Sequence, residues 1–301
     1  MIITALLTMV VIWCLFYGAF SNIVLLILCI MTGVFLAAVS RHKHEGILVI
    51  DIIAQHSKLN QVNASLKFWT VLVLLFLCVA SDSMIIGLVL TVAMFILIVP
   101  FGGLHFHTYL SLISLPVSFL LISALALLFD YGITAEGIIN LPLFWGYLFV
   151  SPSSQLRAAI VLSKALGALS CLYLLSLSTP MSEIISVLRK AHIPDIVIEL
   201  MYLIYRYTFV LLELYRSMKD AAKSRLGFIN FSVSVKTTGK IYSNLLARSY
   251  QKAMKNFDAM ESRCYTGEIR FLEQEKKVSL LQGILAISSV IIILGLTVAL
   301  H

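Results

Sequence analysis

The chain has 301 residues, of which 60% are hydrophobic and only 12% are charged, and its mean hydropathy is +0.99. This composition excludes a soluble globular domain, a disordered chain and a disulfide-rich secreted scaffold, because long apolar runs dominate it. The net charge of +7 matters less than its distribution, since the cytoplasmic loops of membrane proteins collect Lys and Arg. The composition therefore predicts an all-α polytopic membrane protein.

Apolar stretches with at most one charged residue, close to the length needed to cross about 30 Å of hydrocarbon, roughly 20 residues each, predict seven membrane spans. In chain order they cover residues 2–17, 23–39, 66–80, 84–101, 108–129, 158–178 and 278–300. Ser81-Asp82-Ser83 separates the third span from the fourth, because these residue types favour a turn. Four regions are expected: an N-terminal transmembrane hairpin at 1–44, a transmembrane core at 45–180, a charged module at 181–277 and a last transmembrane helix at 278–301.

Charge is concentrated in residues 181–277, which hold 16 of the 22 Lys and Arg and 10 of the 15 Asp and Glu. The positive-inside rule places this segment in the cytoplasm and, by alternation, the C-terminus outside. Residues 196–212 are mostly apolar, but Glu199 and Arg206 lie two helical turns apart on one polar stripe, which predicts a helix outside the membrane. Residues 138–150 are too few to cross and predict an external interfacial or re-entrant piece.

A second amphipathic helix is predicted over residues 240–263, where apolar side chains recur every three or four residues and lysines lie opposite. If residues 242–263 form one helix, Arg248 and Arg263 lie about 22 Å apart and are rotated by roughly 60°. On the preceding helix we expect internal pairing of charges, for example Glu213 with Arg216.

No catalytic or nucleotide-binding set is recognisable in the sequence. The run Thr237-Thr238-Gly239-Lys240-Ile241 lacks the first glycine and the last hydroxyl of a P-loop. Asp82 and Asp130 lie at the ends of spans and Lys164 lies one turn inside its span, so the mid-membrane relay of a proton-driven carrier is missing. We therefore expect no enzyme activity, no cofactor and no nucleic-acid partner.

Histidine pairs occur at His42 and His44 and again at His105 and His107, in short predicted loops. Because no cluster of Cys, Asp or Glu accompanies them, we expect histidines at a membrane interface rather than a metal site. The basic module at 181–277 is compatible with two interpretations: a surface that binds anionic lipid headgroups, or a docking surface for a partner protein.

Several short motifs occur in a fixed order and together carry a family resemblance. They are Ile50-Asp51, Asn63-Ala64-Ser65-Leu66-Lys67, Thr179-Pro180-Met181-Ser182-Glu183, Tyr205-Arg206-Tyr207, Ala221 to Gly227, Ala247-Arg248-Ser249 and Ser262-Arg263-Cys264. Their order and spacing resemble the transmembrane T component of energy-coupling factor transporters, CbiQ type, which serves cobalt and nickel uptake. Asn63 stands where that family usually has proline, and Cys264 stands where it commonly has glycine. The hairpin at 1–44 has no counterpart in the family's five-span core.

The resemblance implies a non-enzymatic scaffold in a prokaryotic plasma membrane. Such a scaffold joins two ABC-type ATPase subunits, on its cytoplasmic side, to a small membrane subunit that binds the substrate, cobalt or nickel. The implied ATPase-coupling residues are Ala247, Arg248, Ser249, Ser262, Arg263 and Cys264, and the implied structural residues of the coupling helices are Pro180, Pro194, Arg206, Arg225 and Gly227. The alternative is a stand-alone metal-ion channel or secondary carrier.

Overall fold

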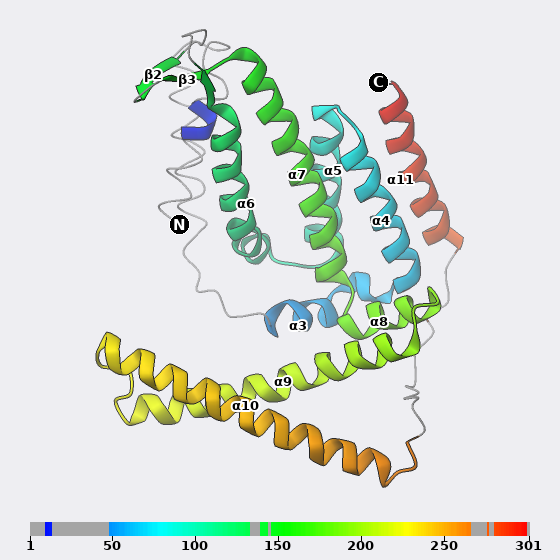
Figure 1. The fold of residues 1–301 in the computed structure, drawn as a ribbon. Coiled ribbons are helices and arrows are strands. Elements are labelled where there is room, and N and C mark those ends of the chain that lie inside the picture. Colours follow the sequence, from blue (N-terminus) through cyan, green and yellow to red (C-terminus); the bar gives the residue numbers. More distant parts are fainter. Residues whose placement is uncertain are drawn as a thin grey trace. The chain divides into compact units, whose positions relative to one another are not determined.

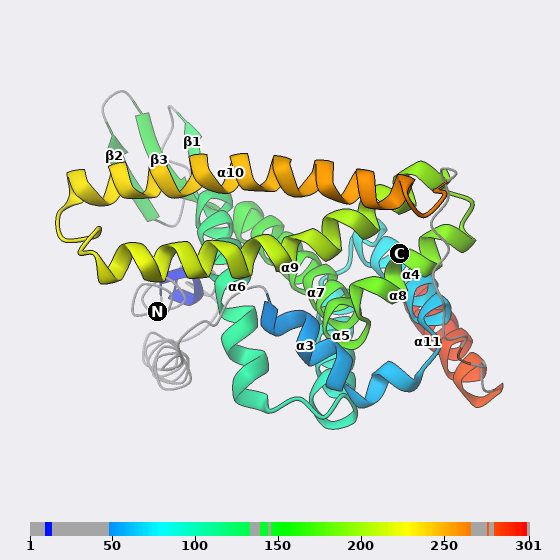
Figure 2. The ribbon, with the colours of Figure 1, turned by 90° about the horizontal axis from the view of Figure 1, so that it is seen from below.

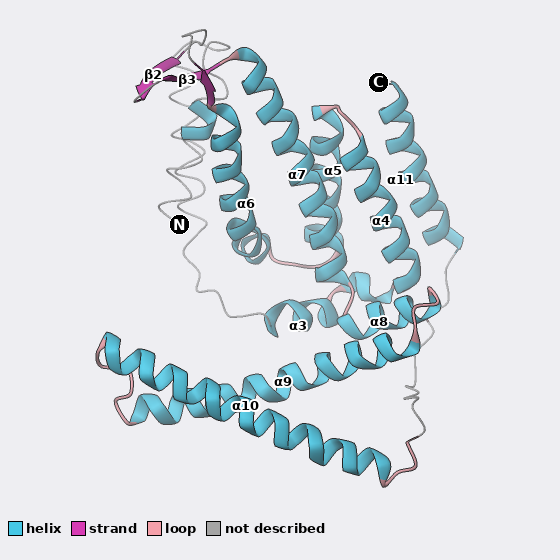
Figure 3. Ribbon diagram, viewed as in Figure 1, coloured by secondary structure: helices cyan, strands magenta, loops and turns pink. Residues whose placement is uncertain are grey.

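In a computed structural model of the protein, the described residues are 10–13, 48–132, 139–143, 146–265, 276 and 280–299. They belong to two compact units: residues 1–180 with 276–301, and residues 181–275. Helices dominate the described part of both units, and strands are confined there to three short segments (Figure 3). The predicted class, an all-α polytopic membrane protein, is confirmed. The predicted N-terminal hairpin lies outside the described residues, apart from the helical residues 10–13.

The first unit, which we call the membrane unit, contains the helices that match the predicted core spans. Four of its described helices have the length and hydropathy to cross a membrane: α5, Met84–Ile96, continued by the π-helical turn η2, Leu97–Phe101; α6, Phe106–Leu128; α7, Pro152–Ser178; and α11, Leu280–Ala299. Helix α4, Ala64–Ala80, is equally apolar but has 17 residues. These helices stand side by side in Figure 1.

Helix α7 is the centre of the membrane unit, and α4, α5 and α6 all pack against it. The closest approach is to α5, where a Cβ atom on Gly87 would overlap the carbonyl oxygen of Ser163. A Cβ atom on Gly167 would lie 2.8 Å from the Cys78 sulfur and 3.0 Å from the Gly87 carbonyl oxygen. Small residues at these points let the backbones of α5 and α7 touch. Such close van der Waals packing holds helices together in a bilayer, where lipid supplies no hydrophobic driving force between them.

The charged residues predicted at span ends form ion pairs there. Lys164 Nζ lies 2.8 Å from Asp82 Oδ1, and Arg157 Nη2 lies 2.9 Å from Asp130 Oδ2. The first pair joins α7 to the turn between α4 and α5. These pairs satisfy side chains that would be costly to leave unpaired near hydrocarbon.

A small antiparallel sheet follows α6, with β1, Asp130–Gly132, β2, Ile139–Leu143, and β3, Gly146–Val150, in the order β1-β3-β2. Ile139 is opposite Val150, and Asp130 is opposite Phe149. In Figure 1 the sheet lies at the end of the membrane unit opposite α3, Leu48–His56. Within the segment predicted as an interfacial or re-entrant piece, the described residues 139–143 and 146–150 are therefore paired antiparallel strands, in keeping with their β-branched and aromatic residues.

The second unit, which we call the helical arm, consists of α8, Met181–Lys190, α9, Asp195–Ser224, and α10, Phe231–Glu261. Helices α9 and α10 form a long antiparallel hairpin whose members cross and pack together (Figures 1 and 2). Helix α9 contains residues 196–212 and is not among the described helices that meet the criteria for a membrane span. Helix α10 begins well before residue 240 and ends two residues before Arg263.

Candidate functional site

The residues with an implied structural role lie mainly at the ends of the helices of the arm. Pro180 immediately precedes α8, and Pro194 is the N-cap of α9, where its carbonyl accepts from the Val197 amide at 2.9 Å. Arg225 is the C-cap of α9. Arg206 lies within α9 and is exposed. Prolines suit these places because a proline lacks the amide donor that a helix interior requires.

The turn from α9 to α10 depends on Gly227. Its amide donates to the Ala222 carbonyl at 2.9 Å, while Leu226 adopts a left-handed φ of 57°. A Cβ atom on Gly227 would lie 2.9 Å from that carbonyl oxygen and 3.0 Å from Thr237 Cγ2 on α10. Glycine therefore lets α10 turn back closely along α9.

The two long helices of the arm are held together where they cross. The rings of Tyr215 and Tyr242 stack with centroids 5.8 Å apart, and Ile241 is buried beside them. The expected ion pair between Glu213 and Arg216 is wrong, because both side chains are exposed and the two do not form an ion pair with each other. Water solvates exposed charges well enough that such helix pairs add little stability.

Arg248 projects from near the midpoint of α10. Its side chain is exposed and makes no hydrogen bond or ion pair with the described residues. Its neighbour Ser249 turns its hydroxyl back to the Leu246 carbonyl at 2.8 Å, and Ala247 has no polar side chain. Arg248 is thus the cation of this motif that is available to a partner.

Arg263 lies in the turn after α10, so the prediction of one helix through residue 263 is wrong. The Tyr265 amide donates to the Met260 carbonyl at 3.1 Å, and Cys264 adopts a φ of 56°, which together close the helix in a Schellman-type end. Ser262 donates its hydroxyl to the Asp258 carbonyl at 2.7 Å. Arg263 Nη1 lies 3.2 Å from the Ala259 carbonyl, yet the side chain is exposed.

A hydrogen bond between Tyr265 and Glu199 joins the end of α10 to the start of α9. The Tyr265 hydroxyl donates to Glu199 Oε2 at 2.6 Å, and Glu199 is only 6% exposed. This bond raises the pKa of the Tyr265 phenol, because the carboxylate acceptor favours the protonated hydroxyl. The polar stripe predicted from the sequence includes Glu199 but does not indicate this partner, which lies 66 residues away.

Cys264→Gly is expected to stabilise the end of α10 by about 1 kcal/mol, because a left-handed conformation costs a residue with a Cβ atom roughly that much. Hydrogen exchange of the amides at 258–265 would measure the gain. Cys264→Ala is the matched control, since alanine removes the thiol and keeps the Cβ atom. An equal gain from alanine would show that the thiol, and not the backbone conformation, is responsible.

The apolar stripe of α10 is exposed over the half of the helix that carries Arg248. Leu246 is 72% exposed, Tyr250 69% and Phe257 57%. The cations Arg248, Lys252 and Lys255 lie on the opposite side of the helix. The arm therefore presents an apolar face and a basic face on a single rigid helix.

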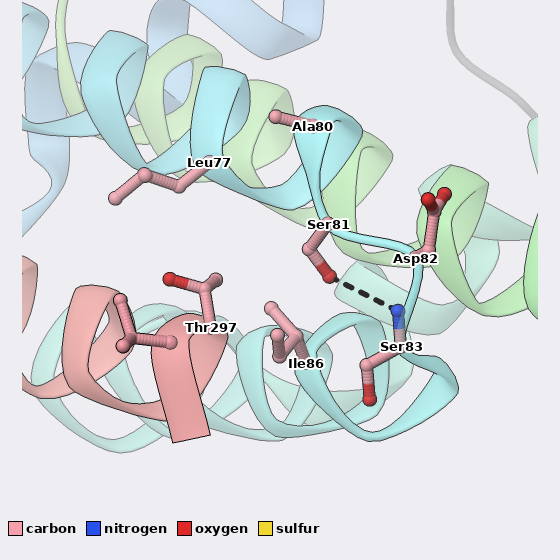
Figure 4. Close-up of a pocket in the computed structure, with 8 residues that line it drawn as sticks. Leu77, Ala80, Ser81, Asp82, Ser83, Ile86 and Thr297 are labelled. Atoms are coloured by element: carbon pink, nitrogen blue, oxygen red, sulfur yellow. Dashed lines mark hydrogen bonds between the residues drawn. The ribbon is translucent and has the colours of Figure 1, made fainter. Parts of the chain in front are cut away.

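The membrane unit offers a pocket but no cluster of metal ligands among its described residues. The pocket, of about 550 Å³, lies between α4, α5 and α11 and is lined by Leu77, Ala80, Ser81, Asp82, Ser83, Ile86, Thr297 and Val298 (Figure 4). Asp82 is its one carboxylate, and no group of three or more His, Cys, Asp or Glu gathers within the described ranges. His105 precedes α6 and His107 lies in its first turn, whereas His42 and His44 fall outside the described residues.

Comparison with known proteins identifies the family. The model of the cobalt transport protein family CbiQ matches residues 55–277, which is most of the chain and includes α4 to α10. The chain belongs to the CbiQ family of cobalt transport proteins. This family is that of the T component of energy-coupling factor transporters, CbiQ type, as the sequence motifs predicted.

Individual CbiQ relatives support the same assignment. The chain is 31% identical to an uncharacterized protein of Methanocaldococcus jannaschii, over 75% of this chain and 83% of the relative. It is 29% identical to a protein of Methanocorpusculum labreanum described as a fused cobalt transport protein CbiMQ, over 83% of this chain and 42% of that relative. It is 27% identical to the cobalt transport protein CbiQ of Rhodobacter capsulatus, over 55% of this chain and 63% of that relative.

Membership of this family makes the chain a multi-pass membrane component of a cobalt transport system. It is a transporter component and not a catalytic enzyme. The family match begins at residue 55, so residues 1–44, for which a transmembrane hairpin is predicted, lie outside the matched part of the chain.

Proposed function

We propose that this CbiQ-family protein is the transmembrane scaffold of an ATP-driven cobalt importer of the energy-coupling factor type. Residues 45–180 and 278–301 form its membrane core, residues 181–277 its coupling module, and residues 1–44 an added transmembrane hairpin. The observation that carries the proposal is the pair of exposed arginines, Arg248 in the middle of α10 and Arg263 in the turn that follows this helix. Two separate guanidinium groups presented along one helix and its terminal turn suit a protein that binds two partners.

The proposed partners of these arginines are ABC-type ATPase subunits. These subunits would hydrolyse ATP to drive transport, since the sequence of this chain has no P-loop to bind a nucleotide. A guanidinium holds several acceptors at once through its planar fork, which makes it suited to a groove on a partner protein. Ala247, Ser249, Ser262 and Cys264 flank the two arginines with small side chains, and Pro180, Pro194, Arg206, Arg225 and Gly227 shape the helices that present them.

A second proposed partner is a small membrane subunit that binds cobalt or nickel. The fused CbiMQ relative supports this part of the proposal, since its name joins a CbiQ portion to another cobalt transport portion in one chain. The absence of a metal-ligand cluster from the described residues fits a division of labour in which another subunit binds the ion.

Vesicles that contain the purified chain alone are expected to take up no Co²⁺, with or without ATP, whereas vesicles with the ATPase and the substrate-binding subunit take it up when ATP is supplied. Radioactive Co²⁺ inside the vesicles is the measurement. Uptake by the chain alone, together with tight Co²⁺ binding that is lost when His42, His44, His105 and His107 are replaced by alanine, would establish the alternative of a stand-alone channel or carrier.

The proposal places residues 181–277 in the cytoplasm of a prokaryotic cell and the C-terminus outside its plasma membrane. Reporter fusions at Lys240 and after His301 are therefore expected to report opposite sides, because the excess of Lys and Arg lies in this segment and one span, α11, separates the two points. Fusions that report the same side would contradict the crossing by α11, whereas opposite sides with Lys240 outside would contradict the proposed orientation.

A further inference from the structure

The chain passes between the membrane unit and the helical arm at two places. It leaves the membrane unit after Pro180, two residues beyond the end of α7, and it returns at Lys276, shortly before α11. Any force that the arm transmits along the chain must act through these two connections. The hydrogen bonds that hold each connection within the membrane unit are therefore of interest.

The outgoing connection is held by Lys67, at the start of α4. Lys67 Nζ donates to the carbonyl of Ser178 at 2.8 Å and to the carbonyl of Leu59 at 3.0 Å. Ser178 is the last residue of α7 and is buried, and the carbonyls of a last helical turn have no partner within the helix. An ammonium group at this position also complements the negative end of the α7 dipole.

The returning connection is held by two asparagines that lie just before Lys67. Asn63 Nδ2 donates to the Lys276 carbonyl at 2.6 Å, and Lys276 Nζ donates to Asn60 Oδ1 at 2.9 Å. Asn63 also caps α4, because its Oδ1 accepts from the amides of Ser65 and Leu66. One asparagine thus fixes the start of α4 and the re-entry of the chain.

The same stretch is bonded to the connection between α5 and α6. Ser57 Oγ and the Lys58 amide both donate to the Gly102 carbonyl, each at 3.3 Å. Residues 57–67, which we call the junction segment, include the 3₁₀ turn η1, Lys58–Gln61. They therefore include the start of α4 and contact the α5–α6 connection, the end of α7 and the approach to α11.

We propose that the junction segment transmits displacement of the helical arm to the membrane helices, with Lys67 and Asn63 as its positioning residues. This inference rests on the proposed coupling function. Both connections are bonded to one stretch through main-chain carbonyls, so a pull on either displaces the start of α4 and, through Gly102, the α5–α6 connection. Without these bonds each connection could move while the membrane helices stay in place.

The test measures ATP hydrolysis and Co²⁺ uptake together in vesicles that contain the complete transporter. With Lys67→Met we expect the Co²⁺ taken up per ATP hydrolysed to fall at least about fivefold, because losing a hydrogen bond from a charged donor shifts a two-state equilibrium by roughly tenfold or more. The Lys67→Arg variant should keep most of the wild-type ratio of Co²⁺ taken up to ATP hydrolysed, since a guanidinium can also donate to two carbonyls. A merely structural role would lower the amount of complex but would leave the ratio unchanged.

Two further variants keep the test decisive. Asn63→Asp retains the acceptor that caps α4 and loses the donor to Lys276, so it should fold and still lower the ratio. Lys164→Met is the matched control: it removes the Asp82 ion pair at the opposite end of α4 and should leave the ratio unchanged. An unchanged ratio in both Lys67→Met and Asn63→Asp would overturn the inference and leave the coupling function standing, whereas a wild-type complex without ATP-dependent uptake would overturn both.

Discussion

A double variant with Arg248→Glu and Arg263→Glu is expected to lose its ATPase subunits entirely during purification, and each single substitution to weaken docking by roughly 30-fold or more. The reason is that a buried, multiply hydrogen-bonded guanidinium at an interface is typically worth about 2 to 5 kcal/mol. In the free chain both side chains are exposed, so the substitutions leave the fold of the arm intact. Co-purification of the ATPase with each variant is the measurement, and ATP-dependent Co²⁺ uptake accompanies it.

The control for this experiment is Lys255→Glu, which makes the same change of charge on the same face of α10, two turns from Arg248. Lys255 is also exposed, so this variant should keep its ATPase. Arg248→Lys should also weaken docking of the ATPase, because an ammonium keeps the charge and loses the planar fork of donors. A double glutamate variant with a full complement of ATPase and normal uptake would show that the arginines are only surface charges.

Gly87→Val is expected to destabilise the membrane unit by more than about 3 kcal/mol, beyond the usual cost of an overpacked core, because the new Cβ atom meets backbone and not a movable side chain. At this point the first clash is with the Ser163 carbonyl on α7. Helices α5 and α7 must move apart, which also loosens the contacts around Gly167 and Cys78. Thermal unfolding of the purified chain in detergent is the measurement.

Gly283→Val in α11 is the control for this substitution. It has the same change of residue in a membrane helix, but nothing lies within 4 Å of the Cβ position at Gly283. Both variants carry the same change of helix propensity, so the difference between them isolates the helix contact. Equal midpoints of unfolding would contradict the close packing of α5 on α7.

The membrane helices could be predicted from the sequence because their signal is local. The predicted span at 84–101 matches α5 with η2, and the predicted span at 158–178 lies within α7. An apolar run of the required length has few alternative structures in a bilayer. The sheet was not predicted, because residues 138–150 are as compatible with an interfacial segment as with strands, and their pairing with Asp130–Gly132 is a tertiary property.

The arginine motifs could be found from the sequence, but their surroundings could not. The end of α10 depends on hydrogen bonds of the turn at Cys264, so the helix stops before Arg263 although the amphipathic pattern continues. The contacts of Glu199 with Tyr265 and of Lys67 with Ser178 join residues 66 and 111 positions apart. No spacing rule for one helix or one strand reaches across such distances.

The membrane unit is discontinuous in sequence, since α11 packs against α4 after the whole arm has intervened. During synthesis the ribosome must therefore make residues 181–275 before the last span of the unit can enter the bilayer. At about 5 to 20 residues per second this takes on the order of 5 to 20 s. For that time α4 lacks the contact with α11 that it makes in the complete membrane unit. Final closure of the membrane unit is thus a late step of biogenesis, which follows emergence of the arm from the ribosome.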